Sequence, residues 1–212
     1  MPADAKQWSP TKVRILRATA ELIAKQGYSA TSTRDIAAAV GVEQPALYKH
    51  FSAKSDIFAA IVRLALEWPV ELAEELATLS APGAVKLHRF LRESLNHLHA
   101  SPEVVVSVIA TPDLWQDTFT AEQELAQKVE HQLAELIETA QAEGDVRAMN
   151  PISASRLVQA LFDALTPQLT VSPDEILEFA MMGLLSDPSR LSEIASAAGA
   201  LDIKTTPPSI GI

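Results

Sequence analysis

The spacing of apolar residues predicts helices along most of this chain. Apolar side chains recur every three or four residues, whereas the alternating Val, Ile, Thr and Tyr runs that indicate strands are missing. Ser9-Pro10 is typical of a helix start, because serine can cap a helix and proline is tolerated at its first position. Gly27 is typical of the end of that helix, since glycine readily adopts left-handed backbone angles. We therefore expect an all-α protein.

Residues 32–54 predict two short helices separated by a tight turn. Ser32 and Asp35 have the spacing of a capping box at the start of the first helix. Gly41 breaks that helix, and the second begins near Gln44-Pro45. Two short helices joined by a glycine-containing turn form a helix-turn-helix. An ordinary helical hairpin is the alternative, but the residues that the second helix exposes favour the helix-turn-helix.

The remaining apolar pattern predicts a helical body. A longer helix begins at Lys54, with Ser52 as its cap, and runs to about Trp68, where Pro69 kinks or ends it. Further helices are expected in the stretch after Pro82 that contains Leu87, Leu91, Leu95 and Leu98, and over 104–110, 120–143, 151–166 and 173–186. No structured pattern precedes Ser9, and residues 201–212 are expected to form a loose tail.

Charge is divided unevenly between the two ends of the chain. The net charge of −10 would disfavour nucleic acid as a partner if it were spread evenly. Residues 1–58, however, carry a net charge of +3, and the rest carries −13. A basic head on an acidic body is the asymmetry expected if one end meets phosphate, although small charge asymmetries are common and this signal alone does not decide.

Composition and motifs exclude several other classes of protein. The chain has no cysteine, which rules out disulfides and thiolate metal sites and fits a reducing cytosol. No apolar stretch has the length of a membrane span, and the N-terminus lacks the apolar core of a signal peptide. His97 and His99 do not share a helix face, so we expect no metal, and we expect no cofactor. Catalytic signatures such as G-x-S-x-G and H-E-x-x-H are absent, and acidic pairs such as Glu74-Glu75 are interpreted as solvated charge, so we expect no enzyme.

The outward face of the second short helix carries groups suited to DNA. Gln44 can bond adenine N6 and N7, and Pro45 can pack on a thymine methyl group. Three following side chains can reach phosphates, namely Tyr48, Lys49 and His50. Arg34 starts the preceding helix, where it can reach a guanine edge or a phosphate. Lys54 starts the next helix, where the helix dipole favours an anion.

Residues 31–58, TSTRDIAAAVGVEQPALYKHFSAKSDIF, resemble the DNA-binding signature of the TetR family of bacterial repressors. The most specific parts are the Gly41-Val42 pair, the Tyr48-x-His50-Phe51 run and Lys54. The resemblance implies a three-helix helix-turn-helix DNA-binding head at 9–55 and a helical effector-binding and dimerisation body at 56–200.

The same resemblance implies roles for individual residues of the head. Arg34 and Gln44 would contact bases, with Pro45 making an apolar contact. The phosphates would be held by Thr33, Tyr48, His50 and Lys54. We therefore expect a sequence-specific transcriptional regulator, cytoplasmic in a bacterium and associated with the nucleoid, that binds a palindromic double-stranded operator.

The last two predicted helices, 151–166 and 173–186, indicate a homodimer. The run from Phe179 to Leu185 is apolar on every side, and a helix without a polar face must be buried all round. In a body of this size that favours a second subunit, although a central core helix in a monomer is the alternative. The resemblance implies the same pairing, because family members dimerise through their last two long helices.

The body also contains candidates for a small apolar or aromatic effector. The residues that could line a pocket are Trp68, His88, Leu91, Trp115, Phe119 and Phe162, although such residues are more often plain core. Together with the head they predict a repressor released from its operator by effector binding, with coupling through the helix that starts at Lys54. The alternative is control by a protein partner, or an activator, which a long exposed apolar patch outside the dimer face would favour.

Overall fold

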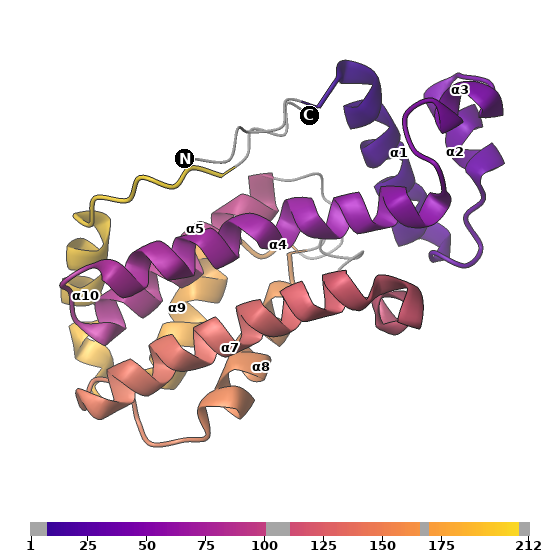
Figure 1. The fold of residues 1–212 in the computed structure, drawn as a ribbon. Coiled ribbons are helices and arrows are strands. Elements are labelled where there is room, and N and C mark those ends of the chain that lie inside the picture. Colours follow the sequence, from indigo (N-terminus) through magenta and orange to yellow (C-terminus); the bar gives the residue numbers. More distant parts are fainter. Residues whose placement is uncertain (1–7, 101–110, 166–169, 208–212) are drawn as a thin grey trace.

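The computed structural model describes residues 8–100, 111–165 and 170–207, and these are helical with no β-strand (Figure 1). The helices are α1 (Pro10–Gln26), α2 (Thr33–Val40), α3 (Gln44–Tyr48), α4 (Lys54–Thr78), α5 (Gly83–Ala100), α7 (Thr120–Ala142), α8 (Pro151–Phe162), α9 (Pro173–Leu184) and α10 (Leu191–Gly199). Three short 3-10 turns are η1 (Pro112–Trp115), η2 (Asp117–Phe119) and η3 (Pro188–Arg190). The all-α prediction is confirmed, whereas the helix predicted at 104–110 lies outside the described residues.

Local signals in the sequence set the boundaries of the helix-turn-helix. The Ser32 hydroxyl accepts the Asp35 N–H at 3.1 Å, and the Asp35 carboxylate accepts the Ser32 N–H at 2.9 Å, which is the predicted capping box. Gly41 ends α2 with φ 73° and ψ 36°, left-handed angles that cost a side-chain-bearing residue free energy. Leu47 of α3 is buried against the α1–α2 pair, so the short helix is fixed by packing.

Helix α4 begins at Lys54 as predicted, but its capping residue and its end differ from the prediction. Its N-cap is Ala53 and not Ser52, and the Asp56 carboxylate accepts the Ala53 N–H at 3.0 Å. Pro69 does not end the helix, which continues to Thr78. Proline removes one helical hydrogen bond, and the buried side chains on either side of it, including Trp68 and Leu72, stabilise the continued helix by packing.

The body is a bundle in which α7 packs against α4, α5 and α8, while α9 and α10 pack against α5. In Figure 1, α4 runs from the head through the whole body, and α7 lies beside it. The start of α5 crosses α7 closely at Gly83, where a Cβ atom would lie 2.7 Å from the Ala140 nitrogen. Glycine at this position therefore sets the distance between two central helices.

The C-terminal part of the chain contradicts two expectations. Helix α10 was not predicted, because its short run of alanines and serines shows little periodicity, yet Ile194 and Ala198 are buried. The segment 201–207, predicted to be part of a loose tail, lies against the body. The Glu75 carboxylate accepts the backbone N–H groups of Lys204 at 2.7 Å and Thr205 at 2.8 Å. Glu75, interpreted as solvated charge, thus holds this segment on α4.

Candidate nucleic-acid interface

Three polar side chains form a cluster on the exposed surface of the helix-turn-helix. The amide nitrogen of Gln44 donates to the Thr33 hydroxyl at 2.8 Å and approaches the Tyr48 hydroxyl at 3.5 Å. The Thr33 and Tyr48 hydroxyls are 3.3 Å apart. Gln44 and Tyr48 are exposed and Thr33 is half-buried. The cluster joins the start of α2 to α3, and it orients the Gln44 amide before any partner binds.

The other predicted contact residues surround this cluster. Arg34, Pro45 and Lys49 are exposed, and His50 is half-buried just beyond α3. The side chains of these four residues make no hydrogen bond or ion pair with the described residues. The structure therefore brings a free guanidinium, a free ammonium and an oriented amide onto one surface, which is the set that meets base edges and phosphates in a major groove.

Three contacts that the sequence pattern does not predict fix the head. The Arg14 guanidinium donates to the Val40 carbonyl, so a cation on α1 caps the C-terminal end of α2. Trp8, which was expected to be unstructured, stacks on Phe51 with ring centroids 6.2 Å apart. The Lys12 ammonium lies 5.3 Å from the Phe51 ring. Only tertiary structure brings these groups together, since they are 26 or more residues apart.

The Lys54 ammonium has hydrogen-bond partners within the head. It donates to the carbonyls of Tyr28 at 2.7 Å and Thr31 at 2.8 Å, and lies 3.9 Å from the centroid of the Tyr28 ring. Burial lowers the pKa of this ammonium, an effect opposed by the negative charge of Asp113. In this structure the side chain that is expected to bind phosphate joins α4 to the loop between α1 and α2.

The same loop connects the head to the body. Tyr28 packs on Phe58 of α4 with ring centroids 4.8 Å apart, and edge-on against Phe119 at 5.5 Å. The Ser29 hydroxyl donates to the Asp113 carboxylate at 3.1 Å. We call Tyr28, Ser29, Phe58, Asp113 and Phe119 the junction. Through it the α1–α2 loop contacts both α4 and the segment that leads into α7.

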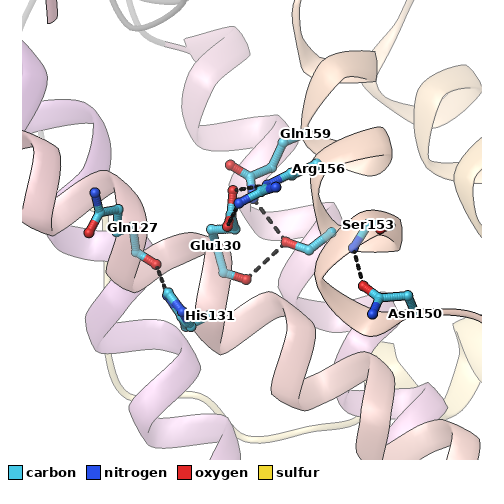
Figure 2. A network of polar contacts seen from close by, with 8 residues as sticks. Gln127, Glu130, His131, Asn150, Ser153, Arg156 and Gln159 are labelled. Carbon is cyan, nitrogen blue, oxygen red and sulfur yellow. Dashed lines mark hydrogen bonds and ion pairs between the residues drawn. The ribbon is translucent and has the colours of Figure 1, made fainter. Parts of the chain in front are cut away.

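A cavity of about 330 Å³ lies in the body between α4, α5, α7 and α8. Most of its wall is apolar, with Leu66, Phe90, Leu98, Val129, Leu133 and Phe162 among the lining residues. Its polar groups include Ser94 and the Arg156–Glu130 ion pair, in which two guanidinium nitrogens donate to the two carboxylate oxygens at 2.9 and 3.0 Å. Figure 2 shows this pair with Gln159 beside it.

Of the six predicted pocket residues, only Phe162 lines this cavity. Trp68, His88 and Leu91 are buried elsewhere in the core, and Trp115 is 58% exposed in η1. Phe119 belongs to the junction. Apolar character alone did not separate cavity walls from packed core, because both need the same residue types. Within the described residues no group of three or more His, Asp or Glu is placed to hold a metal, and no helix is long and apolar enough to cross a membrane.

Comparison with known proteins agrees with this architecture. The model of the bacterial regulatory proteins of the tetR family matches residues 15–61. The HTH-type transcriptional regulator AcrR of Shigella flexneri is 44% identical over 54 residues, which are 26% of this chain and 25% of that protein. The chain thus matches only a quarter of the length of AcrR.

Solved structures extend the likeness to the body. The crystal structure of Mycobacterium smegmatis AmtR has a TM-score of 0.75 at 28% identity, over 94% of this chain and 97% of that one. AibR, in complex with isovaleryl coenzyme A and operator DNA, has a TM-score of 0.66 at 20% identity, over 81% and 96%, which shows the fold alone. The homologues are transcriptional regulators of the helix-turn-helix type, and residues 15–61 form a DNA-binding domain of the TetR family of bacterial regulatory proteins.

Proposed function

We propose that this chain is a sequence-specific repressor that binds a palindromic DNA operator as a homodimer and is released by a small-molecule effector. The observation that carries the DNA-binding part is the Thr33–Gln44–Tyr48 cluster on the helix-turn-helix surface. An amide already oriented by two hydroxyls loses less side-chain entropy when it pairs with a base. Arg34 and Gln44 contact bases, Pro45 makes an apolar contact, and Thr33, Tyr48, Lys49 and His50 hold phosphates.

The dimer is supported by an apolar surface on α8 and α9. Leu157 is 71% exposed, Phe179 is 70% exposed and Met182 is 48% exposed. Helix α9 buries its opposite side, including Ile176, in the core. Large side chains exposed in one place mark an interaction site. Pairing two copies across this face gives a two-fold dimer whose recognition helices can meet successive major grooves, about 34–36 Å apart.

Effector release is supported by the position of the cavity. It lies between α4 and α7, and both helices continue to the junction with the head. A ligand that changes how α4 and α7 pack therefore acts on the α1–α2 loop as well as on α4. Such a switch requires a ligand that binds the two arrangements with different affinities. AibR shows that a protein of this fold can be crystallised with both a small molecule and operator DNA.

The test begins by selecting duplexes from a randomised pool with the full chain. We expect a palindromic consensus, and a complex with two chains per duplex. Titration of that duplex, with and without a library of small apolar molecules, then measures release. Recovery of random sequences would overturn sequence-specific binding, and a library in which no compound changes the operator affinity would overturn effector release.

A further inference from the structure

Hydrogen-bond acceptors outnumber available donors in the wall of the cavity. On α4, Pro69 has no N–H, so the carbonyl of Ala65 four residues earlier lacks its usual helical donor, and both residues line the cavity. On α5, Ser94 is only 3% exposed, and its hydroxyl has no hydrogen-bond partner in the described part of the chain. A buried hydroxyl without a partner costs free energy that a bound polar group can recover.

The end of α8 adds negative charge to the same cavity. Gln159, Ala160, Phe162 and Asp163 all line it, so the cavity lies at the C-terminal end of this helix, where the helix dipole is negative. The last turn of α8 contains no basic residue. Asp163 is an exposed residue with no ion-pair partner among the described residues, and the loss of part of its hydration raises the pKa of its carboxyl group.

The charged and amide donors in the cavity wall already have partners, and the unpartnered Ser94 hydroxyl can donate as well as accept. Among the described residues that line the cavity, Arg156 is the one basic residue, and Glu130 binds its guanidinium through both carboxylate oxygens. The amide nitrogen of Gln159 donates to the Ser155 hydroxyl at 3.0 Å. The amide oxygen of Gln159 remains as a further acceptor, so a ligand that brings donors finds more partners in this wall than one that brings only acceptors.

We infer that the effector is an apolar molecule with a protonated amine, whose apolar part fills the space beside Phe90 and Leu133 and whose ammonium lies at the end of α8 beside Asp163. This inference rests on the proposed effector role of the cavity. An ammonium has three donors and no acceptor, which matches a wall of carbonyl, hydroxyl and carboxylate oxygens. A carboxylate of the same shape would face Asp163 and the negative end of α8.

Three matched probes test the charge preference on the full chain. They are 4-phenylbutylamine, 4-phenylbutanol and 4-phenylbutyrate, which share one apolar body and differ in the terminal group. Isothermal titration calorimetry at pH 7 measures each dissociation constant. We expect the amine to bind at least about tenfold more tightly than the acid, with the alcohol between them. Equal binding of amine and acid, or no binding of the amine, would overturn the inference.

Two variants test whether Asp163 causes the preference for the amine over the acid. Asp163→Asn keeps the shape of the side chain and removes its charge, and we expect the ratio of acid to amine dissociation constants to fall below about threefold. Asp202→Asn removes an equal charge from an exposed position outside the cavity, and the ratio should stay as in the parent chain. An unchanged ratio in Asp163→Asn would contradict the assignment of the ammonium site.

A separate titration with the selected operator keeps the two proposals distinct. An amine that binds the cavity without weakening operator binding contradicts effector release but supports the ligand class. Release of the operator by the acid and not by the amine supports effector release and contradicts the ligand class.

Discussion

The head and the body expose side chains for different physical reasons. In the head, the free groups are polar and stand on helices whose ends are fixed by short-range signals such as the Ser32–Asp35 capping box. In the body, large apolar side chains are exposed on α8 and α9, and the cavity is formed by residues of four helices that spread over positions 65–163. Local rules therefore determine the surface proposed for DNA, whereas tertiary packing determines where a ligand and a second subunit fit.

The largest effect is expected from breaking the apolar surface of α8 and α9. Phe179→Glu places a charge where we propose that two subunits meet, and burying an unpaired charge is strongly unfavourable. The variant should be monomeric, and operator affinity should fall by about 10²-fold or more, because each head then binds alone. Sedimentation equilibrium and an operator titration measure the two effects.

Trp115→Glu is the matched control for this variant. Trp115 is also exposed, at 58%, but it lies in η1 and outside α8 and α9. The Trp115→Glu protein should remain dimeric, and its operator affinity should equal that of the parent chain. A dimeric Phe179→Glu protein would show that the second subunit uses another surface.

The body should also respond to pH through His88. This side chain is 3% exposed, and its pKa is lowered to about 4, first by burial and then by the charges of Arg92 and Arg89. The unfolded chain therefore binds a proton between about pH 6.5 and 4 that the folded chain does not, so stability falls as pH falls through this range. The loss approaches about 3 kcal/mol near pH 4.

His88→Leu removes this titration and a buried ring nitrogen that has no partner among the described residues. Denaturant unfolding at several pH values should give a shallower loss of stability with acid. Part of the dependence of stability on pH remains in this variant, because burial also lowers the pKa of His97. His99→Leu, at an exposed position of the same helix, is the control. If His88→Leu leaves the pH profile unchanged, His88 must bind a proton in the folded chain as readily as in the unfolded chain.

The sequence was sufficient for the helix boundaries of the helix-turn-helix because those signals act over three or four residues, whereas the long-range contacts of Trp8, Arg14 and Lys54 were not predicted. The capping box, the Gly41 turn and the exposed Gln44 were all predicted from spacing alone.

The body was less predictable. Pro69 indicated a kink or an end of the helix, and α4 continues past it because tertiary packing outweighs one lost hydrogen bond. The cavity could not be located, since Phe162 lines it while Leu91, with the same apolar character, is packed core.

A smaller effect, confined to the head, is expected for Gln44→Ala. The variant should lose about 1–3 kcal/mol on the selected operator and relax the preference at one base pair, because a paired contact to an adenine edge is removed. Tyr48→Phe removes one of the hydroxyls that orient the amide but leaves the amide itself, so we expect a smaller loss with the preference kept. Competition assays with single-base variants of the operator measure both. Parental preference at every position in Gln44→Ala would show that this amide contacts no base.

The smallest effect on DNA is expected where the resemblance implies a direct contact. In Lys54→Met the carbonyls of Tyr28 and Thr31 lose a charged donor, so the free energy of unfolding should fall by about 1–2 kcal/mol. The salt dependence of DNA binding should stay close to that of the parent, because an ammonium bound to two carbonyls releases no counterion from DNA. Lys49→Ala is the control, since its exposed ammonium should flatten the salt dependence by about one unit. If Lys54→Met flattens it equally, the ammonium must exchange its carbonyl partners for phosphate when DNA binds. The contacts around the junction would then differ between the free and the DNA-bound protein. The boundary between a head determined by local signals and a body determined by packing would lie at α4.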